Sequence, residues 1–133
     1  GAYRKFWDVW MEANDPPNPE YASLAEVATK GQLELARSKI TSHREDHLLY
    51  RDRPMSVRAH RINVVSKSPD QIVLRDCNLD DGLVLDSRTL EVTNDAVSTH
   101  LWDATMTKEG GTWKLADNEQ IQKWAGPSDC GGG

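Results

Sequence analysis

Three side chains of this sequence have the chemistry for proton transfer and are predicted to face the interior: Asp76, His47 and His100. Asp76 follows two apolar residues at alternate positions of a predicted strand, and alternate residues share one face of a strand. His100 lies on the inward face of a later strand, and His47 ends the inward stripe of a predicted helix. A carboxylate and an imidazole in an apolar pocket can exchange a proton with a bound molecule when burial shifts their pKa values. These three residues are the candidate catalytic groups.

The same residues also have structural interpretations. Asp76 could cap a turn or pair with Arg44 or Arg61, and an inward histidine is more often a packed core residue than a general base. The three candidates lie on separate elements, and no sequence signature links them. The chain also lacks a glycine-rich phosphate loop, a Gly-X-Ser-X-Gly elbow and a His-Glu-X-X-His motif. No catalytic residue is firmly assigned, and binding, which needs only an apolar wall and one or two polar anchors, is the simpler prediction.

The two cysteines, Cys77 and Cys130, are either a disulfide pair or two unrelated thiols. An even cysteine count in an extracytoplasmic protein favours the disulfide, which would join a strand end to the C-terminal tail. Closing that loop is worth about 4 kcal/mol in the chain-entropy description. Two cysteines alone cannot form a zinc site, and the histidines do not stand at ligand spacing from them. We therefore predict a Cys77–Cys130 disulfide, no metal site and no cofactor.

The length of 133 residues predicts a single domain over residues 2–130, and residues 131–133 are interpreted as a linker remnant. The net charge is −5, with acids and bases interspersed, which argues against a nucleic-acid-binding surface of clustered Lys and Arg. No apolar run approaches the ~20 residues of a membrane span. Gly1 resembles a cloning remnant, which is consistent with a domain cut from a longer chain, its leader or membrane anchor removed.

Apolar residues at helical spacing predict three helices in the first 50 residues. The first carries an aromatic stripe that includes Phe6 and Trp10, and the prolines that follow it cannot continue a helix. The third carries an inward stripe that includes Ile40 and ends at His47. The predicted helices cover residues 2–14, 19–28 and 32–49.

From residue 56 onward the pattern changes to the two-residue period of strands. The clearest signal is a hairpin around Gly110 and Gly111, because two runs rich in β-branched and aromatic residues flank this short turn. Trp102, Ala104 and Met106 share the inward face of its first strand. Helices followed by strands predict an α+β fold with helices on one face of a curved antiparallel sheet. The predicted strands cover residues 57–66, 71–77, 83–85, 90–92 and 99–106, with a return strand from 112.

Three segments resemble the nuclear-transport-factor-2-like superfamily: the helix start 2–7, the proline break 14–17 and the strand start 110–115. That is the cone-shaped α+β fold shared with steroid delta-isomerases and polyketide cyclases. Asp76-Cys77 and the late Cys130 resemble small extracytoplasmic domains of actinobacteria and their phages, which often follow a lipoprotein or membrane anchor. The resemblance covers nearly the whole chain. It implies three N-terminal helices packed on a strongly curved antiparallel sheet, and it supports the fold more than any activity.

We predict a non-catalytic extracytoplasmic module, secreted or anchored at the cell surface, whose apolar cone pocket takes a small ligand or a protein partner. A small-molecule isomerase or cyclase is one alternative. A structural homodimer is another, because the open sheet face of this fold often pairs with a copy of itself. We expect the buried core to include Phe6, Trp10, Ile40, Trp102 and Leu115. The predicted ligand-binding residues are Phe6, Trp10, Ile40, His47, Asp76, His100, Trp102 and Met106.

Overall fold

The computed structural model describes residues 1–131, so residues 132–133 of the predicted linker remnant lie outside the described part of the chain. Its helices precede its strands, which confirms the predicted mixed α+β class. The helices are α1 (Ala2–Ala13), α2 (Leu24–Val27) and α3 (Lys30–Glu45). The strands are β1 (Leu48–Arg51), β2 (Ala59–Lys67), β3 (Gln71–Asp80), β4 (Leu83–Asp86), β5 (Val92–Asn94), β6 (Ser98–Glu109) and β7 (Thr112–Ala125).

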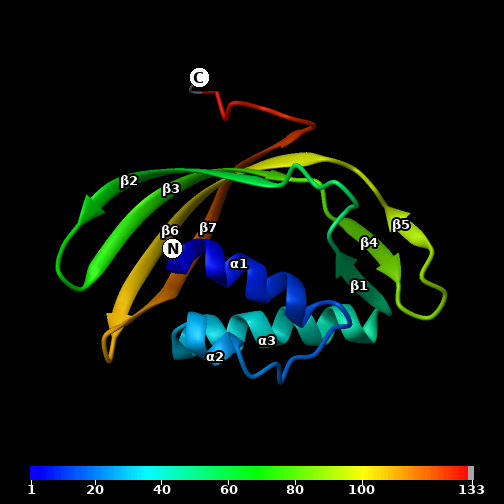
Figure 1. Ribbon diagram of the computed structural model, residues 1–133, viewed down its shortest axis with the longest axis horizontal. Coiled ribbons are helices and arrows are strands. Elements are labelled where there is room, and N and C mark those ends of the chain that lie inside the picture. The colour runs from blue at the N-terminus through cyan, green and yellow to red at the C-terminus, as the bar shows by residue number, and fades with distance from the viewer. Residues whose placement is uncertain (132–133) are drawn as a thin grey trace.

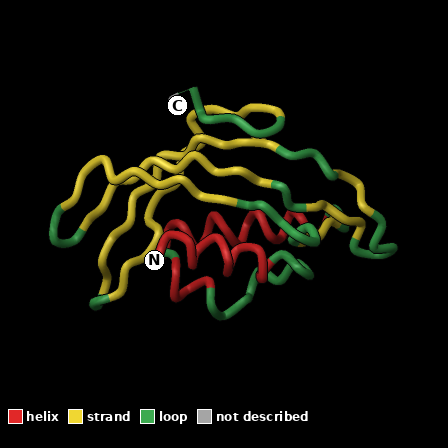
Figure 2. The backbone as a smooth tube through the Cα atoms, turned by 45° about the horizontal axis from the view of Figure 1, so that its top comes forward, coloured by secondary structure: helices red, strands yellow, loops and turns green. Residues whose placement is uncertain are grey.

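The strands form two antiparallel sheets, where the sequence predicted one. The larger sheet has the order β2-β3-β6-β7, and the smaller has the order β1-β4-β5. In Figure 1 the larger sheet lies on one side of α1 and α3, and the smaller sheet lies near the C-terminal ends of both helices. The turned view in Figure 2 shows the same separation of strands from helices. One face of the larger sheet is therefore covered by helices.

The predicted hairpin is confirmed and is longer than expected. β6 and β7 pair from Glu109 opposite Thr112 back to Ser98 opposite Ala125. Gly110 and Gly111 have φ values of 57° and 83°. A two-residue hairpin turn with positive φ at both positions favours glycine, which has no side chain to clash there.

The third helix ends earlier than predicted. It stops at Glu45, and His47 has a left-handed φ of 57°. Leu48 to Arg51 then pair with β4, and Leu49 is buried opposite Leu85. Burying Leu49 between strands is a tertiary gain that outweighs the helical periodicity of the local sequence.

The second helix is also shorter than the predicted span of residues 19–28. Before α2 the chain forms tight turns, in which Tyr21 N–H bonds Asn18 O and Leu24 N–H bonds Tyr21 O. The Tyr21 hydroxyl donates to Glu12 of α1 at 2.7 Å. Tyr21 is thus held against α1 and does not complete an apolar helical stripe.

The strand predicted from Val57 begins two residues later. The Ser56 hydroxyl and the Val57 N–H both donate to the carboxylate of Asp81, at 2.6 and 2.7 Å. Asp81 is buried, and these bonds satisfy its charge. The backbone at residues 56–57 is therefore engaged with a side chain and does not extend the sheet.

The hydrophobic core lies between the helices and the inward face of the larger sheet. Phe6, Ile40 and Leu115 are buried there as predicted. Trp10 and Trp102 are only partly buried, so the prediction that they belong to the fully buried core is wrong. Their large rings carry a polar N–H, and both line cavities beside the core.

Candidate functional site

Asp76 is the buried polar centre of the inward sheet face. It is 0% exposed. Its Oδ2 accepts a hydrogen bond from the Tyr3 hydroxyl at 2.6 Å and lies 2.7 Å from His60 Nδ1 in a second hydrogen bond. A carboxylate removed from water is stable only with such partners, because an unsolvated charge is costly. Its Oδ1 is also buried and has no hydrogen-bond partner among residues 1–131.

The two partners of Asp76 come from different elements. Tyr3 projects from the first turn of α1, and His60 comes from β2, two residues before the Ile62 that pairs with Asp76. The His60 ring stacks on Trp7 with centroids 6.0 Å apart and meets Tyr3 edge-on at 5.8 Å. The His60 side chain is 9% exposed. Two aromatic contacts and one hydrogen bond thus fix the imidazole against the carboxylate.

Tyr3 is a permanent hydrogen-bond donor in this cluster. Burial raises the pKa of Tyr3 above its ordinary value of 10.0, and the neighbouring Asp76 carboxylate raises it further. A phenol with a raised pKa keeps its proton across the physiological range. Tyr3 therefore stays neutral and stabilises the buried carboxylate of Asp76 by donating a hydrogen bond to it.

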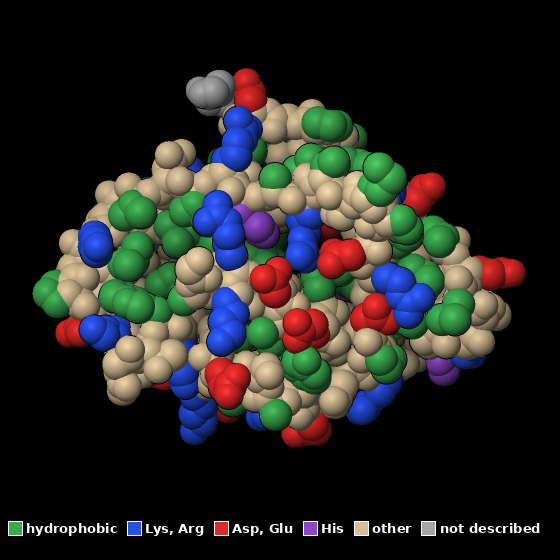
Figure 3. Space-filling view, viewed as in Figure 1, with side chains coloured by type: hydrophobic (Ala, Val, Ile, Leu, Met, Phe, Trp, Pro, Cys, Tyr) green, Lys and Arg blue, Asp and Glu red, His purple; other side chains and the backbone are tan. Residues whose placement is uncertain are grey.

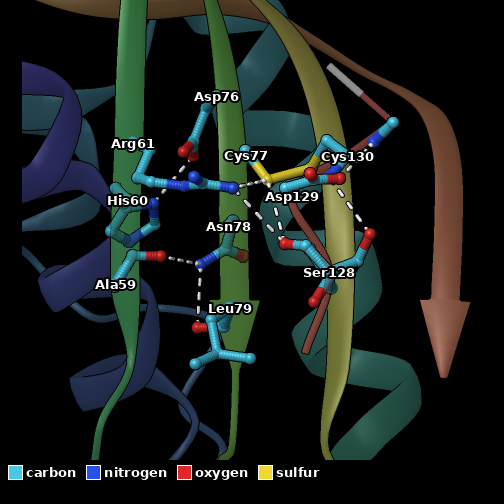
Figure 4. The surroundings of a disulfide bond; sticks show 12 residues. Ala59, His60, Arg61, Asp76, Cys77, Asn78, Leu79, Ser128, Asp129 and Cys130 are labelled. Atoms are coloured by element: carbon cyan, nitrogen blue, oxygen red, sulfur yellow. Dashed lines mark hydrogen bonds and ion pairs between the residues drawn. A yellow bond between two sulfur atoms is a disulfide. The ribbon is translucent and has the colours of Figure 1, made fainter. Parts of the chain in front are cut away.

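Asp76 pairs with neither arginine considered in the sequence interpretation, and it does not cap a turn. Arg61 lies opposite Cys77 in the β2–β3 register, so its side chain leaves the sheet on the other face from Asp76. Its guanidinium donates to Cys77 Sγ at 3.2 Å, as Figure 4 shows. Arg44 is exposed near the end of α3. The sheet's alternation excludes Arg61, and Arg44 lies on the exposed side of the last turn of α3.

His100 is placed apart from Asp76. In the β3–β6 register it lies opposite Asn78, whereas Trp102 lies opposite Asp76. His100 Nδ1 is hydrogen bonded to Gln120 Oε1 at 2.6 Å, and its Nε2 to the hydroxyl of Ser98 at 2.9 Å. The predicted acid–histidine combination of Asp76 with His100 therefore does not form, and both His100 nitrogens are engaged.

His47 does not face the interior, so that prediction is wrong. It is exposed, it follows the end of α3, and its carbonyl accepts a hydrogen bond from Ser87 N–H at 2.8 Å. The histidine of α3 that does pack inward is His43. Its Nδ1 is hydrogen bonded to Asn14 Oδ1 at 2.7 Å, and its ring stacks on Tyr50 at 4.4 Å. Burial lowers the pKa of His43, which favours the neutral imidazole.

Beside the core, the space between α1, α3 and the sheet opens into a cavity of about 180 Å³, here called the aromatic cavity. Four of the predicted ligand-binding residues line it. Ile40 and Met106 lie instead in the filled core, and Asp76 is buried outside the cavity wall. The lining residues are Phe6, Trp7, Trp10, Gln32, Leu35, Ala36, Lys39, Asn78, Asp80, His100, Trp102 and Asn118.

A second cavity of about 100 Å³ adjoins the first and is here called the histidine cavity. The two share Trp7, Trp10, Asn78 and Asp80, so they meet along the inner side of α1. His60 lines the histidine cavity and not the aromatic one. The remaining lining residues are Met11, Tyr50, Arg58, Gly82, Leu83 and Val84.

Three polar atoms on the wall of the aromatic cavity are buried without a partner. They are Trp7 Nε1, Trp102 Nε1 and Asn118 Oδ1, and residues 1–131 offer none of them a hydrogen bond. Buried polar atoms are usually paired, because leaving one unpaired costs about 1–3 kcal/mol. These three atoms are closed off behind the wall, and the polar side chains of Gln32, Asn78 and Asp80 also line the cavity, an arrangement suited to a ligand with an apolar body and a few polar atoms.

The predicted ligand-binding residues left out three residues of this region: Trp7, His60 and Asn118. Trp7 stands four residues after Tyr3, so the helical period already placed it beside the inward stripe. His60 alternates with Ile62 on β2, which is the signal that would have identified it. Asn118 follows a β-bulge between β6 and β7, and a bulge changes which residues face inward in a way the sequence pattern does not show.

The predicted disulfide is confirmed. Cys77 of β3 and Cys130 of the C-terminal tail are bonded, and Figure 4 shows the tail held across the strands at this bond. The Thr99 hydroxyl donates to Gly126 O at 2.8 Å, which holds the start of the tail. The disulfide therefore anchors the tail on the sheet face opposite Asp76.

Within residues 1–131, no cluster of His, Cys, Asp or Glu has the geometry of a metal site. No described helix is long and apolar enough to cross a membrane. Figure 3 shows acidic and basic side chains interspersed over the middle of the face it views.

Comparison with known proteins shows a likeness of fold. No family model matches the chain, and no curated protein matches it. Among solved structures it is similar to the intermembrane space region of the chloroplast protein ARC6, with a TM-score of 0.65 and 14% sequence identity. The match covers 90% of this chain and 90% of that chain. At this identity the likeness concerns the fold alone.

Proposed function

We propose that this chain is a binding module of the cone-shaped, nuclear-transport-factor-2-like kind, and that its adjoining cavities hold a small aromatic ligand. The observation that carries the proposal is the wall of the aromatic cavity. Apolar and aromatic side chains line it together with the polar side chains of Gln32, Asn78 and Asp80. Such a wall offers a small ligand apolar contact and a few polar anchors.

The module is proposed to work outside the cytoplasm. The Cys77–Cys130 disulfide supports this location, because such bonds persist in oxidising compartments. The similarity to an intermembrane space region is compatible with it. The same proposal is that the protein is secreted or anchored at a cell surface.

The isomerase or cyclase alternative has less support than binding. His100 has both nitrogens engaged, and His47 lies at the surface. Asp76 is enclosed by Tyr3 and His60, so it is not open to a substrate. General acid–base catalysis requires a group within hydrogen-bond reach of the reacting atom.

A second copy of the chain is a second candidate partner. Val64 and Val65 on β2 are 60% and 62% exposed, and β2 is an edge strand of the larger sheet. Hydrophobic side chains gather in Figure 3 over the tips of β2 and β3. Exposed apolar edge strands can pair with other strands. Sedimentation of the protein and of Val65→Lys would test this: a dimer that the substitution dissociates supports it, and a monomer at all concentrations contradicts it.

Ligand binding is tested by calorimetry and thermal unfolding with two bicyclic probes of equal shape, indole and benzofuran. At a probe concentration of about 100 times Kd, stabilisation should be about 2.7 kcal/mol. Trp102→Phe should weaken binding about tenfold, since it removes part of the aromatic cavity wall. The matched control is Trp113→Phe, a tryptophan of β7 that lines neither cavity. Absence of binding, or equal losses in both variants, would contradict the proposal.

A further inference from the structure

We propose that His60 determines the specificity of the histidine cavity, accepting through Nε2 a hydrogen bond from a ligand hydroxyl or N–H group. This inference rests on the proposed binding function and names the ligand class: a small, mostly apolar molecule with one hydrogen-bond donor. Asp76 is the positioning residue, because it acts on the ligand only through the imidazole.

The first step concerns the proton on the imidazole ring. An ionised carboxylate can only accept hydrogen bonds. Asp76 Oδ2 receives the Tyr3 hydroxyl at 2.6 Å and lies 2.7 Å from His60 Nδ1. The pair requires a proton on Nδ1, and a neutral imidazole carries only one. The hydrogen bond at one nitrogen sets the role of the other, so Nε2 of the neutral ring presents a lone pair.

The second step concerns where that lone pair lies. The Nδ1 side of the ring is turned to β3, and Trp7 stacks on the ring. His60 lines the histidine cavity, so the polar atom that its ring offers to the cavity is Nε2. Among residues 1–131, Nε2 has no hydrogen-bond partner, and it is not one of the buried atoms closed off from solvent. His100, by contrast, has partners on both nitrogens.

The third step concerns the rest of the cavity. Its other walls are mainly apolar, with Trp10, Leu83 and Val84 among them. Arg58 at the rim is already paired with Asp8 at 3.1 Å and Asp52 at 3.5 Å. A ligand without a donor would cover Nε2 and leave it unpaired, which is the kind of mismatch that polar sites reject most strongly. The cavity therefore favours donor-bearing ligands over isosteres that lack the donor.

The tautomer is tested on the whole protein without ligand. Nitrogen-15 NMR of histidine-labelled protein, at mildly alkaline pH, should show a protonated Nδ1 and an unprotonated Nε2 for His60. The His60→Asn variant assigns the signal by its loss. A proton on Nε2 alone, or on both nitrogens at that pH, would overturn the inference, and the proposed binding function would remain open to its own test.

The ligand class is tested with indole, which has one N–H donor, and benzofuran, which has the same shape and none. Wild-type protein should bind indole about tenfold more tightly, the value of one hydrogen bond. His60→Asn should abolish that preference, because asparagine can still donate to Asp76 but has no group at the Nε2 position.

Asp80→Asn is the control for a second acceptor in this cavity, the charged one. The Asp80 side chain is half-exposed, and its Oδ1 already accepts Gly82 N–H at 2.9 Å. The indole preference should persist in this variant. Equal binding of the two probes by wild-type protein, or a preference lost in Asp80→Asn and kept in His60→Asn, would overturn the role of His60 while leaving the proposed function standing. Binding of neither probe would overturn both.

Discussion

Two halves of the same sheet face differ in what lies opposite them. On β6, Ala104 and Met106 are buried in the core, whereas Trp102 and His100 on the same face line the aromatic cavity. β3 repeats the progression, since Leu74 is in the core and Asn78 lines both cavities. Strand alternation places all of these side chains inward. It does not decide whether the space they enter is filled.

Asp76 lies at the boundary between the two halves. It pairs in register with Trp102, one step from the filled row that contains Leu74 and Ala104. Its Oδ2 has two protein partners, whereas its Oδ1, Trp102 Nε1 and Asn118 Oδ1 have none among the described residues. A charge is far more costly to bury than a neutral N–H or carbonyl. The hydrogen bonds from Tyr3 and His60 offset part of that cost.

The largest expected difference between the halves is on α1. Phe6 is buried in the core, and Phe6→Ala should cost about 3–5 kcal/mol of unfolding free energy. Trp10 is only partly buried beside the cavities, so Trp10→Ala should cost about 1–2 kcal/mol despite its larger ring. Denaturant unfolding of both variants measures the gap. Equal losses would show that the cavity half is packed as tightly as the core.

The boundary is tested by Tyr3→Phe, which keeps the ring and removes one donor to the buried carboxylate. We expect a loss of about 1.5–3 kcal/mol, the range for hydrogen bonds to charged groups. Tyr21→Phe is the matched control, because its hydroxyl donates to the exposed Glu12 carboxylate and should contribute much less. Similar effects of the two substitutions would mean that burial of Asp76 does not depend on Tyr3.

Alkaline pH should weaken the same contact. The pKa of Tyr3 is raised in the folded state, so the folded protein holds this proton more tightly than the unfolded chain does. The stabilisation is complete below the ordinary value of 10.0 and is lost as pH rises above it. The free energy of unfolding, measured across that range, should fall more steeply with rising pH for wild type than for Tyr3→Phe. Parallel curves would contradict the assignment.

The smallest expected effect occurs at acidic pH and concerns His43, near the C-terminal end of α1. Burial lowers the pKa of His43, so its contribution is present above the ordinary value of 6.5 and is lost as pH falls below it. In His43→Gln the free energy of unfolding should decrease slightly less than in wild type as pH falls from neutral to mildly acidic. His47→Gln, at an exposed site one residue beyond the α3 C-cap, should leave the curve unchanged. A larger effect of His47→Gln than of His43→Gln would mean that the titrating group lies outside the core.

Local periodicity determined much of this protein. The helix of residues 2–13, the β6–β7 hairpin, the inward row of Ile72, Leu74 and Asp76, and the Cys77–Cys130 pair all follow from residue types and spacing. Those signals are local because alternation and helical spacing repeat within a single element. The disulfide was predictable because only two cysteines were present to choose from.

Only the tertiary structure decided which inward residues meet. Asp76 is hydrogen bonded to His60 and Tyr3 and not to His100. Strand register and the placement of α1 bring His60 and Tyr3 to the carboxylate. His47 lies at the surface because α3 ends at Glu45 and the chain turns into β1, where Leu49 is buried opposite Leu85. The aromatic cavity exists because the side chains of α1 and α3 do not fill the space opposite His100 and Trp102. Each outcome depends on contacts between distant segments, and no pattern within one segment encodes it.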